Sequence, residues 1–211
     1  MDYLPALILF AVTSTITPGP NNIMILSSGL NFGIYRSLPH YLGICLGFTA
    51  MVFAVGLGLG AVFEQYPVLH QLIKVAGVLY LLYLAWLIAH STSSSLESDT
   101  GQALTFFQAA LFQWVNPKAW VMVTGAVAAY TSVSVDIYWQ VIVITLVFFI
   151  ASFPCVGVWL IFGVGLRKLL TTVEHQKIFN FVMAVLLVLS VLPIVYDLLL
   201  TLVEVSTYEN N

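Results

Sequence analysis

The chain has 211 residues, of which 61% are hydrophobic and only 7% are charged, with a formal net charge of −3. Soluble domains carry roughly 25% charged residues, so this chain cannot cover a water-facing surface. The composition excludes a soluble enzyme, a disordered tail and a nucleic-acid-binding protein, which would need a basic stripe. It is typical of one polytopic α-helical membrane domain.

Apolar segments long enough to cross a bilayer, which takes about 20 residues, follow one another along the whole chain. In chain order the six predicted spans are residues 3–33, 41–63, 68–90, 106–130, 137–166 and 178–202. Pro154 and Pro193, in the last two spans, are interpreted as simple bends. The first apolar run has no basic start and continues too far for a cleavable signal peptide, so we interpret it as the first span.

The predicted spans fall into two halves of three. Residues 91–105 are rich in Ser and Thr and form the clearest solvent-exposed linker between residues 1–90 and residues 106–211. Each half holds three predicted spans, and an odd number inverts the second half relative to the first. We therefore predict an all-α polytopic membrane protein with six transmembrane helices as two inverted three-helix repeats, in which helices one and four are broken near the midplane.

The basic residues predict the orientation in the membrane, because Lys and Arg concentrate in cytoplasmic loops. The loops between spans one and two, three and four, and five and six share one side and carry Arg36, Arg167, Lys168 and Lys177. The opposite side has only Lys74. This bias predicts that both termini lie outside.

The first break is a cluster of helix-breaking and amide residues halfway along the first span. It consists of Thr17, Pro18, Gly19, Pro20, Asn21 and Asn22. Two prolines remove backbone donors, so the helix should open here. Freed carbonyls and amides cost several kcal/mol each in hydrocarbon, and irregular backbone is tolerated only where it faces a cavity or other protein. We expect this run to line a cavity.

The second break is Asn116-Pro117-Lys118, near the middle of the fourth span. A cation at the bilayer centre costs about 2.5–3.5 kcal/mol, so Lys118 should face a cavity and find a partner there. Half-helix N-termini after Pro20 and Pro117 would offer amide donors and a positive dipole end to an anion such as a substrate carboxylate. Broken helices at corresponding positions of two halves indicate a transporter site. A structural ion pair is the alternative role of Lys118.

Other residues of the apolar segments have weaker functional signals. Gly43 and Gly47, and then Gly56 and Gly60, have the spacing of close helix packing. That packing could occur within one chain or between copies in a homo-oligomer. His40 and His70 sit at predicted span mouths, where titration is the less favoured alternative to a structural role.

The motifs at both breaks carry a family resemblance. Thr17-Pro18-Gly19-Pro20-Asn21, followed by Gly33 and Gly43-x-x-x-Gly47-Phe48, resembles the LysE-type translocator family and, more narrowly, its RhtB-type amino-acid exporters. The stretch from Gln113 to Trp120, which contains Asn-Pro-Lys, is similar to the family's fourth span and is nearest to that of the cysteine/O-acetylserine exporters. The resemblance covers the whole chain.

The resemblance implies a secondary transporter of the bacterial inner membrane, with no cofactor. It would export small neutral amino acids or derivatives (of the cysteine, O-acetylserine or threonine/homoserine type) from the cytoplasm, with protons as the coupling ion. Its functional positions would be Pro18, Gly19, Pro20, Asn21, Asn116, Pro117 and Lys118, and we expect Thr17 and Asn22 to join them around a midplane site used by alternating access.

Two other classes of function stay open as alternatives. An inorganic-ion (metal) exporter would need carboxylate or thiolate ligands at depth, and Lys118 would repel a cation. A membrane-embedded enzyme would need a nucleophile with a base or a metal triad. The chain has neither an H-E-x-x-H nor a G-x-S-x-G motif.

Overall fold

The computed structural model describes residues 3–59, 65, 67–90, 103–132 and 136–209. None of these residues forms a strand. In chain order the elements are α1 (Leu4–Ile16), α2 (Pro20–Ala54), the π-helical turn η1 (Val55–Leu59), α4 (Pro67–His90), α5 (Phe106–Phe112), the 3₁₀ turn η3 (Gln113–Val115), α6 (Pro117–Tyr130), α7 (Ile137–Leu169) and α8 (Val173–Glu209). Most of the predicted polar linker, residues 91–102, lies outside the described residues.

Several helices have the length and composition of membrane spans. Within the described part of the chain, Pro20–Gly58, Ile137–Arg167 and Val173–Ser190 are long and apolar enough to cross a bilayer. The shorter apolar helices are Leu4–Ile16, Val75–His90 and Phe106–Val115. The predicted all-α membrane architecture is confirmed at this level, whereas the six spans and the inverted repeat stay predictions.

The α2 helix differs from the expected pattern of two spans joined by a loop. Helical backbone continues from Pro20 to Ala54, interrupted at Gly33, whose φ of 74° is one that glycine adopts without strain. The chain folds back at this point. The evidence is that His40 Nδ1 lies 3.1 Å from Ser28 Oγ, although twelve residues of straight helix would span about 18 Å. We call residues 20–32 the α2 arm.

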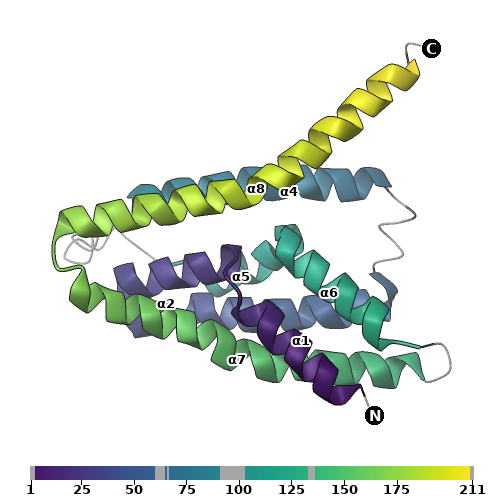
Figure 1. The fold of residues 1–211 in the computed structure, drawn as a ribbon, viewed down its shortest axis with the longest axis horizontal. Coiled ribbons are helices and arrows are strands. Elements are labelled where there is room, and N and C mark those ends of the chain that lie inside the picture. Colours follow the sequence, from purple (N-terminus) through teal and green to yellow (C-terminus); the bar gives the residue numbers. More distant parts are fainter. Residues whose placement is uncertain (1–2, 60–64, 66, 91–102, 133–135, 210–211) are drawn as a thin grey trace.

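The α2, α4 and α7 helices and the first part of α8 run roughly along the long axis of the molecule, whereas α1 and α6 are inclined to it (Figure 1). Figure 1 shows α2 beside α7 and α4 beside α8, and these pairs make the most extensive contacts. The beginning of α1 and the end of α8 lie toward one end of the long axis, and the α1–α2 and α5–α6 breaks lie midway along it (Figure 1). Arg36 and Arg167 line one hollow beside Gly33. These two arginines therefore lie close together, while the arrangement of the loops on the two sides of the membrane stays a prediction.

Glycines allow α2 to approach its neighbours closely, as their spacing predicts. A Cβ at Gly43 would collide with the carbonyl oxygen of Phe106, and one at Gly47 would lie 2.5 Å from Ala110 Cα. A Cβ at Gly56 would lie 2.7 Å from the Val141 side chain. The prediction of close packing is confirmed for these glycines, and Gly60 lies outside the described residues.

We expect Gly47→Ala to destabilise the protein by about 1–3 kcal/mol, because the added methyl group overpacks the contact with α5. Gly165 on α7 is the matched control, since a Cβ there would meet nothing within 4 Å. Gly165→Ala should stabilise the helix by roughly 0.5–1 kcal/mol. Thermal unfolding in detergent measures both changes, and shifts of the same sign would contradict the packing.

Candidate functional site

The first helix break is set by local backbone chemistry. α1 ends at Ile16, and Thr17 is extended (φ −63°, ψ 146°) because a residue that precedes proline avoids helical backbone. α2 begins at Pro20, the helical position at which a missing N–H costs nothing. The last carbonyls of α1 are therefore left without partners inside their own helix.

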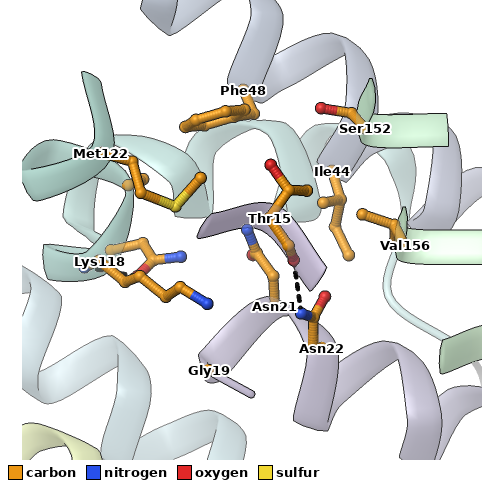
Figure 2. A pocket seen from close by; sticks show the side chains of 12 residues that line it. Thr15, Gly19, Asn21, Asn22, Ile44, Phe48, Lys118, Met122, Ser152 and Val156 are labelled. Carbon is orange, nitrogen blue, oxygen red and sulfur yellow. Dashed lines mark hydrogen bonds between the residues drawn. The ribbon is translucent and has the colours of Figure 1, made fainter. Parts of the chain in front are cut away.

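Asn22 supplies partners for two of these carbonyls. Its side-chain Nδ2 donates to the carbonyl oxygens of Thr15 and Thr17, both at 2.8 Å. The Asn22 side chain is buried, and Figure 2 shows it directly against Thr15. Both N–H groups of this amide are thus used to satisfy the opened end of α1.

The second break has its own cap. Asn116 is extended (φ −84°, ψ 111°), and its side chain accepts a hydrogen bond from the backbone N–H of Lys118 at 3.1 Å. Pro117 follows as the first residue of α6. This is the usual N-cap arrangement, so the N-terminus of α6 is closed by its own sequence.

Lys118 reaches across from the second break to the first. Its Nζ donates to Thr17 O at 2.6 Å, to Thr17 Oγ1 at 2.9 Å and to Pro18 O at 3.3 Å. An ammonium group has three donors, and the C-terminus of a helix such as α1 is its negative end. Among the described residues the partners of Lys118 are these oxygens rather than a carboxylate, so the structure does not bear out an ion pair.

Gly19 leaves the space through which the Lys118 side chain passes. A Cβ at Gly19 would lie 2.6 Å from Lys118 Cδ and 3.1 Å from Nζ. Gly19 is fully extended, a backbone conformation open to any residue, so it is the close approach that requires glycine here.

A reciprocal amide pair also joins the two breaks. Asn21 Nδ2 donates to Gln113 Oε1 at 2.8 Å, and Gln113 Nε2 donates back to Asn21 Oδ1 at 3.1 Å. Gln113 is fully buried and also donates to Ala109 O at 2.9 Å. Gln113 is not among the site residues predicted from the sequence. An amide side chain one turn before Asn116 in an apolar span could have indicated it.

A pocket opens between the breaks (Figure 2). Its unfilled space, including the part open to its surroundings, is about 370 Å³. Five of the nine predicted site residues line it: Gly19, Asn21, Asn22, Asn116 and Lys118. Four do not, namely Thr17, Pro18, Pro20 and Pro117, and these shape the breaks. The lining residues that sequence reasoning missed are Thr15, Ile44, Phe48, Ala119, Met122, Ser152 and Val156.

Two of the missed residues bring hydroxyl groups without partners. Thr15 Oγ1 and Ser152 Oγ are buried and make no hydrogen bond. Figure 2 shows both oxygens directed into the space beside Phe48. A buried polar group left unpaired costs about 1–3 kcal/mol, so these hydroxyls are suited to a polar ligand atom or a water molecule.

The N-terminus of α2 also faces the pocket without a cap. No side chain caps it at Gly19, whereas Asn116 caps α6. Gly19, Asn21 and Asn22 line the pocket, so the positive end of the α2 dipole and the Lys118 ammonium lie on the same side of it. No Asp or Glu is among the lining residues. This arrangement favours an anionic group.

The part of the chain that the structure describes contains no cluster of three or more His, Cys, Asp or Glu side chains able to hold a metal ion. The metal-exporter alternative therefore gains no ligand set from the geometry.

Comparison with known proteins identifies a family and several relatives of this chain. A family model described as LysE type translocator matches residues 12–197. The chain is similar to proteins named "Cysteine/O-acetylserine efflux protein": those of Escherichia coli O157:H7 and Shigella sonnei (strain Ss046) are 30% identical, and that of Escherichia coli (strain UTI89 / UPEC) is 31% identical. Each alignment covers 92% of this chain and 97% of the relative. No solved structure matches the chain.

The amide pair predicts a measurable coupling between the breaks. Asn21→Leu leaves the buried Gln113 amide without its partner, and Gln113→Leu does the same to the half-buried Asn21 amide, so each should cost about 1–3 kcal/mol. The double variant should cost less than the sum, with a coupling of about 0.5–3 kcal/mol. Thermal unfolding of the four proteins in detergent measures this cycle. Strictly additive costs would show that the pair does not hold the breaks together.

Proposed function

The chain belongs to the LysE type translocator family, and from this premise we propose that it is a secondary transporter that exports small neutral amino acids or their derivatives. It is a multi-pass membrane protein, and we place it in the bacterial inner membrane. The single observation that carries the proposal is the pocket between two helix breaks. There an uncapped helix N-terminus, a lysine and unpartnered hydroxyls converge.

The substrate carboxylate would bind at the N-terminus of α2. Its backbone N–H groups and dipole favour an anion, and Lys118 Nζ lies beside Gly19 at that end. The three donors of Lys118 already bond residues 17 and 18. The ammonium therefore acts through its charge, or exchanges a weaker bond such as the 3.3 Å contact to Pro18 O for the carboxylate.

The rest of the pocket suits a short side chain with one polar atom. Ile44, Phe48 and Met122 form an apolar wall, and the hydroxyls of Thr15 and Ser152 provide hydrogen-bonding groups within it. The relatives' printed names specify cysteine and O-acetylserine, both small neutral amino acids. We therefore propose substrates of the cysteine, O-acetylserine or threonine/homoserine type, held in addition by amide oxygens of Asn21, Asn22 and Asn116.

The transport cycle we propose is alternating access driven by the proton gradient. Residues 1–90 and 106–211 would form inverted three-helix repeats, with both termini outside and the pocket at the midplane between the two breaks. Support comes from the position of both breaks midway along the molecule (Figure 1). Further support comes from the irregular backbone at Gly33, which together with the first break bounds the α2 arm.

Replacing Lys118 by methionine tests the carboxylate assignment. Lys118→Met should lower the flux of labelled cysteine in proteoliposomes about tenfold to a hundredfold, because a hydrogen bond to a charged group is worth about 1.5–3 kcal/mol. Lys177→Met, which removes an exposed charge on α8, should leave the flux unchanged. Normal flux through folded Lys118→Met protein would contradict the assignment.

Removing the two pocket hydroxyls should change the substrate specificity without lowering the stability of the ligand-free protein. Thr15→Val and Ser152→Ala should lower the preference for serine over alanine about fivefold to tenfold, the worth of one hydrogen bond of about 1–1.5 kcal/mol. The ligand-free variants should be as stable as the parent or more so, because an unpaired buried hydroxyl is removed. Thr124→Val is the control, since its exposed hydroxyl already bonds Trp120 O at 2.8 Å. Competition of serine and alanine with labelled cysteine measures the preference, and an unchanged ratio would exclude the hydroxyls from recognition.

A further inference from the structure

A second pocket lies at the other end of the α2 arm. Its unfilled space is about 380 Å³, again including the part open to its surroundings. The lining residues are Met24, Ser27, Ser28, Phe32, His40, Leu84, Leu87, Ile88 and Leu104. The wall is apolar apart from two serines and one histidine, and the proposed substrate site does not use it.

His40 is the chemically distinctive group of this pocket. Its side chain is only 1% exposed. Nδ1 lies 3.1 Å from Ser28 Oγ, and Nε2 is buried without a hydrogen-bond partner. A histidine ring presents one donor and one acceptor when neutral and two donors when charged. Nε2 is therefore a nitrogen for which the described conformation supplies no hydrogen-bond partner.

We propose that His40 is the proton-carrying residue of the transport cycle. A proton from the solution on one side of the membrane binds the lone pair of the unprotonated ring nitrogen and gives the imidazolium. The ring then releases that proton to the solution on the other side and becomes neutral again. This inference rests on the proton coupling in the proposed function and assigns it to a site. An imidazole exchanges protons near neutral pH more readily than other side chains.

The surroundings of His40 allow the pocket to respond to that proton. α4 contributes only Leu84, Leu87 and Ile88, and Leu104 closes the pocket from the segment before α5. No lining residue other than His40 titrates. The charged or titratable side chains on neighbouring turns are Arg36 and Tyr41 of α2, Tyr83 and His90 of α4, and Glu174, His175 and Lys177 of α8. Tyr41 is half-buried and donates to Phe153 O at 2.8 Å, and the others are exposed.

The described conformation provides an imidazolium with Ser28 Oγ as its one hydrogen-bond partner. The second N–H of the charged ring would need a further acceptor, and a buried donor without one is costly. The charged ring therefore requires a rearrangement that brings an acceptor to Nε2, whereas the described conformation suits the neutral ring. Protonation of the ring and rearrangement of the pocket around Nε2 are thereby linked through the same group.

The α2 arm connects this pocket to the substrate pocket. Asn22 lines the first pocket and Ser28 the second, and six residues of helix separate them by about 9 Å. The arm is bounded by the break at residues 17–19 and by Gly33. A rigid segment between two irregular points can move as a unit, and both sites bias its position.

A buried amide network ties the same arm to α8. Asn31 Nδ2 donates to Asn180 Oδ1 at 3.0 Å, and Asn180 Nδ2 donates back to Asn31 Oδ1 at 2.9 Å. Asn31 Nδ2 also donates to Ser27 Oγ at 3.1 Å. Ser27, the residue before Ser28, is thus linked through Asn31 to Asn180 of α8. A movement of the α2 arm that follows protonation of His40 is therefore opposed by these hydrogen bonds.

The experiment separates exchange from coupling in proteoliposomes. Labelled cysteine is followed as exchange without a pH gradient and as accumulation driven by an imposed gradient. His40→Gln, which can still bond Ser28 but carries no proton, should retain exchange and accumulate label only to equal concentrations on the two sides. His175→Gln, which changes an exposed histidine on α8, should retain both activities. Gradient-driven accumulation by His40→Gln would overturn the proposal.

A second variant covers the case in which His40→Gln does not fold. Ser28→Ala keeps the histidine and removes its one hydrogen bond, so accumulation should persist with a shifted pH profile. An unchanged profile would overturn the role of His40. Failure of the proposed function looks different, because unmodified protein would then show no cysteine exchange, or exchange without any response to the gradient.

Discussion

A backbone that opens inside an apolar layer must find partners for its freed polar groups, and in this protein each helix break supplies partners to the other. Lys118 donates from the second break to the carbonyls of Thr17 and Pro18 at the end of α1. Asn21 of the first break and Gln113 before the second exchange two hydrogen bonds. The breaks are consequently held side by side, and residues of both line the pocket. The apolar composition and the prolines create the problem that these few polar side chains solve.

The polar groups around the pocket are of two kinds. Some form hydrogen bonds to the opened backbone, and others are left free to bind a ligand. The Asn22 amide and the Lys118 ammonium satisfy the end of α1. The start of α2 and two hydroxyls, on Thr15 and Ser152, have no such task. The residues most conspicuous in the sequence are thus partly architectural, while less conspicuous ones complete the pocket.

Much of the fold could be predicted from local chemistry, whereas contacts between distant segments could not. Proline at the first helical position and extended backbone before it are local rules, so the helix starts at Pro20 and Pro117 follow from the sequence. Which side of a uniformly apolar helix faces the protein interior is decided by tertiary packing. The sequence of α7 has no regular spacing of polar residues that would have predicted that Ser152 lines the pocket. The burial of His40 was missed for a related reason. Residues 33–41 suggest a loop, and only the packing of the reversed helix shows that the ring turns inward.

The bond between Lys118 and Thr17 joins residues that are 101 positions apart, and this separation has a consequence for synthesis in the cell. The first break emerges from the ribosome long before the side chain that completes it. At about 5–20 residues per second, the interval is roughly 5–20 s. During that time the carbonyls at the end of α1 depend on Asn22, on water or on the insertion machinery. The nascent first half therefore passes through a stage at which its opened helix end lacks the contacts that Lys118 supplies in the folded protein.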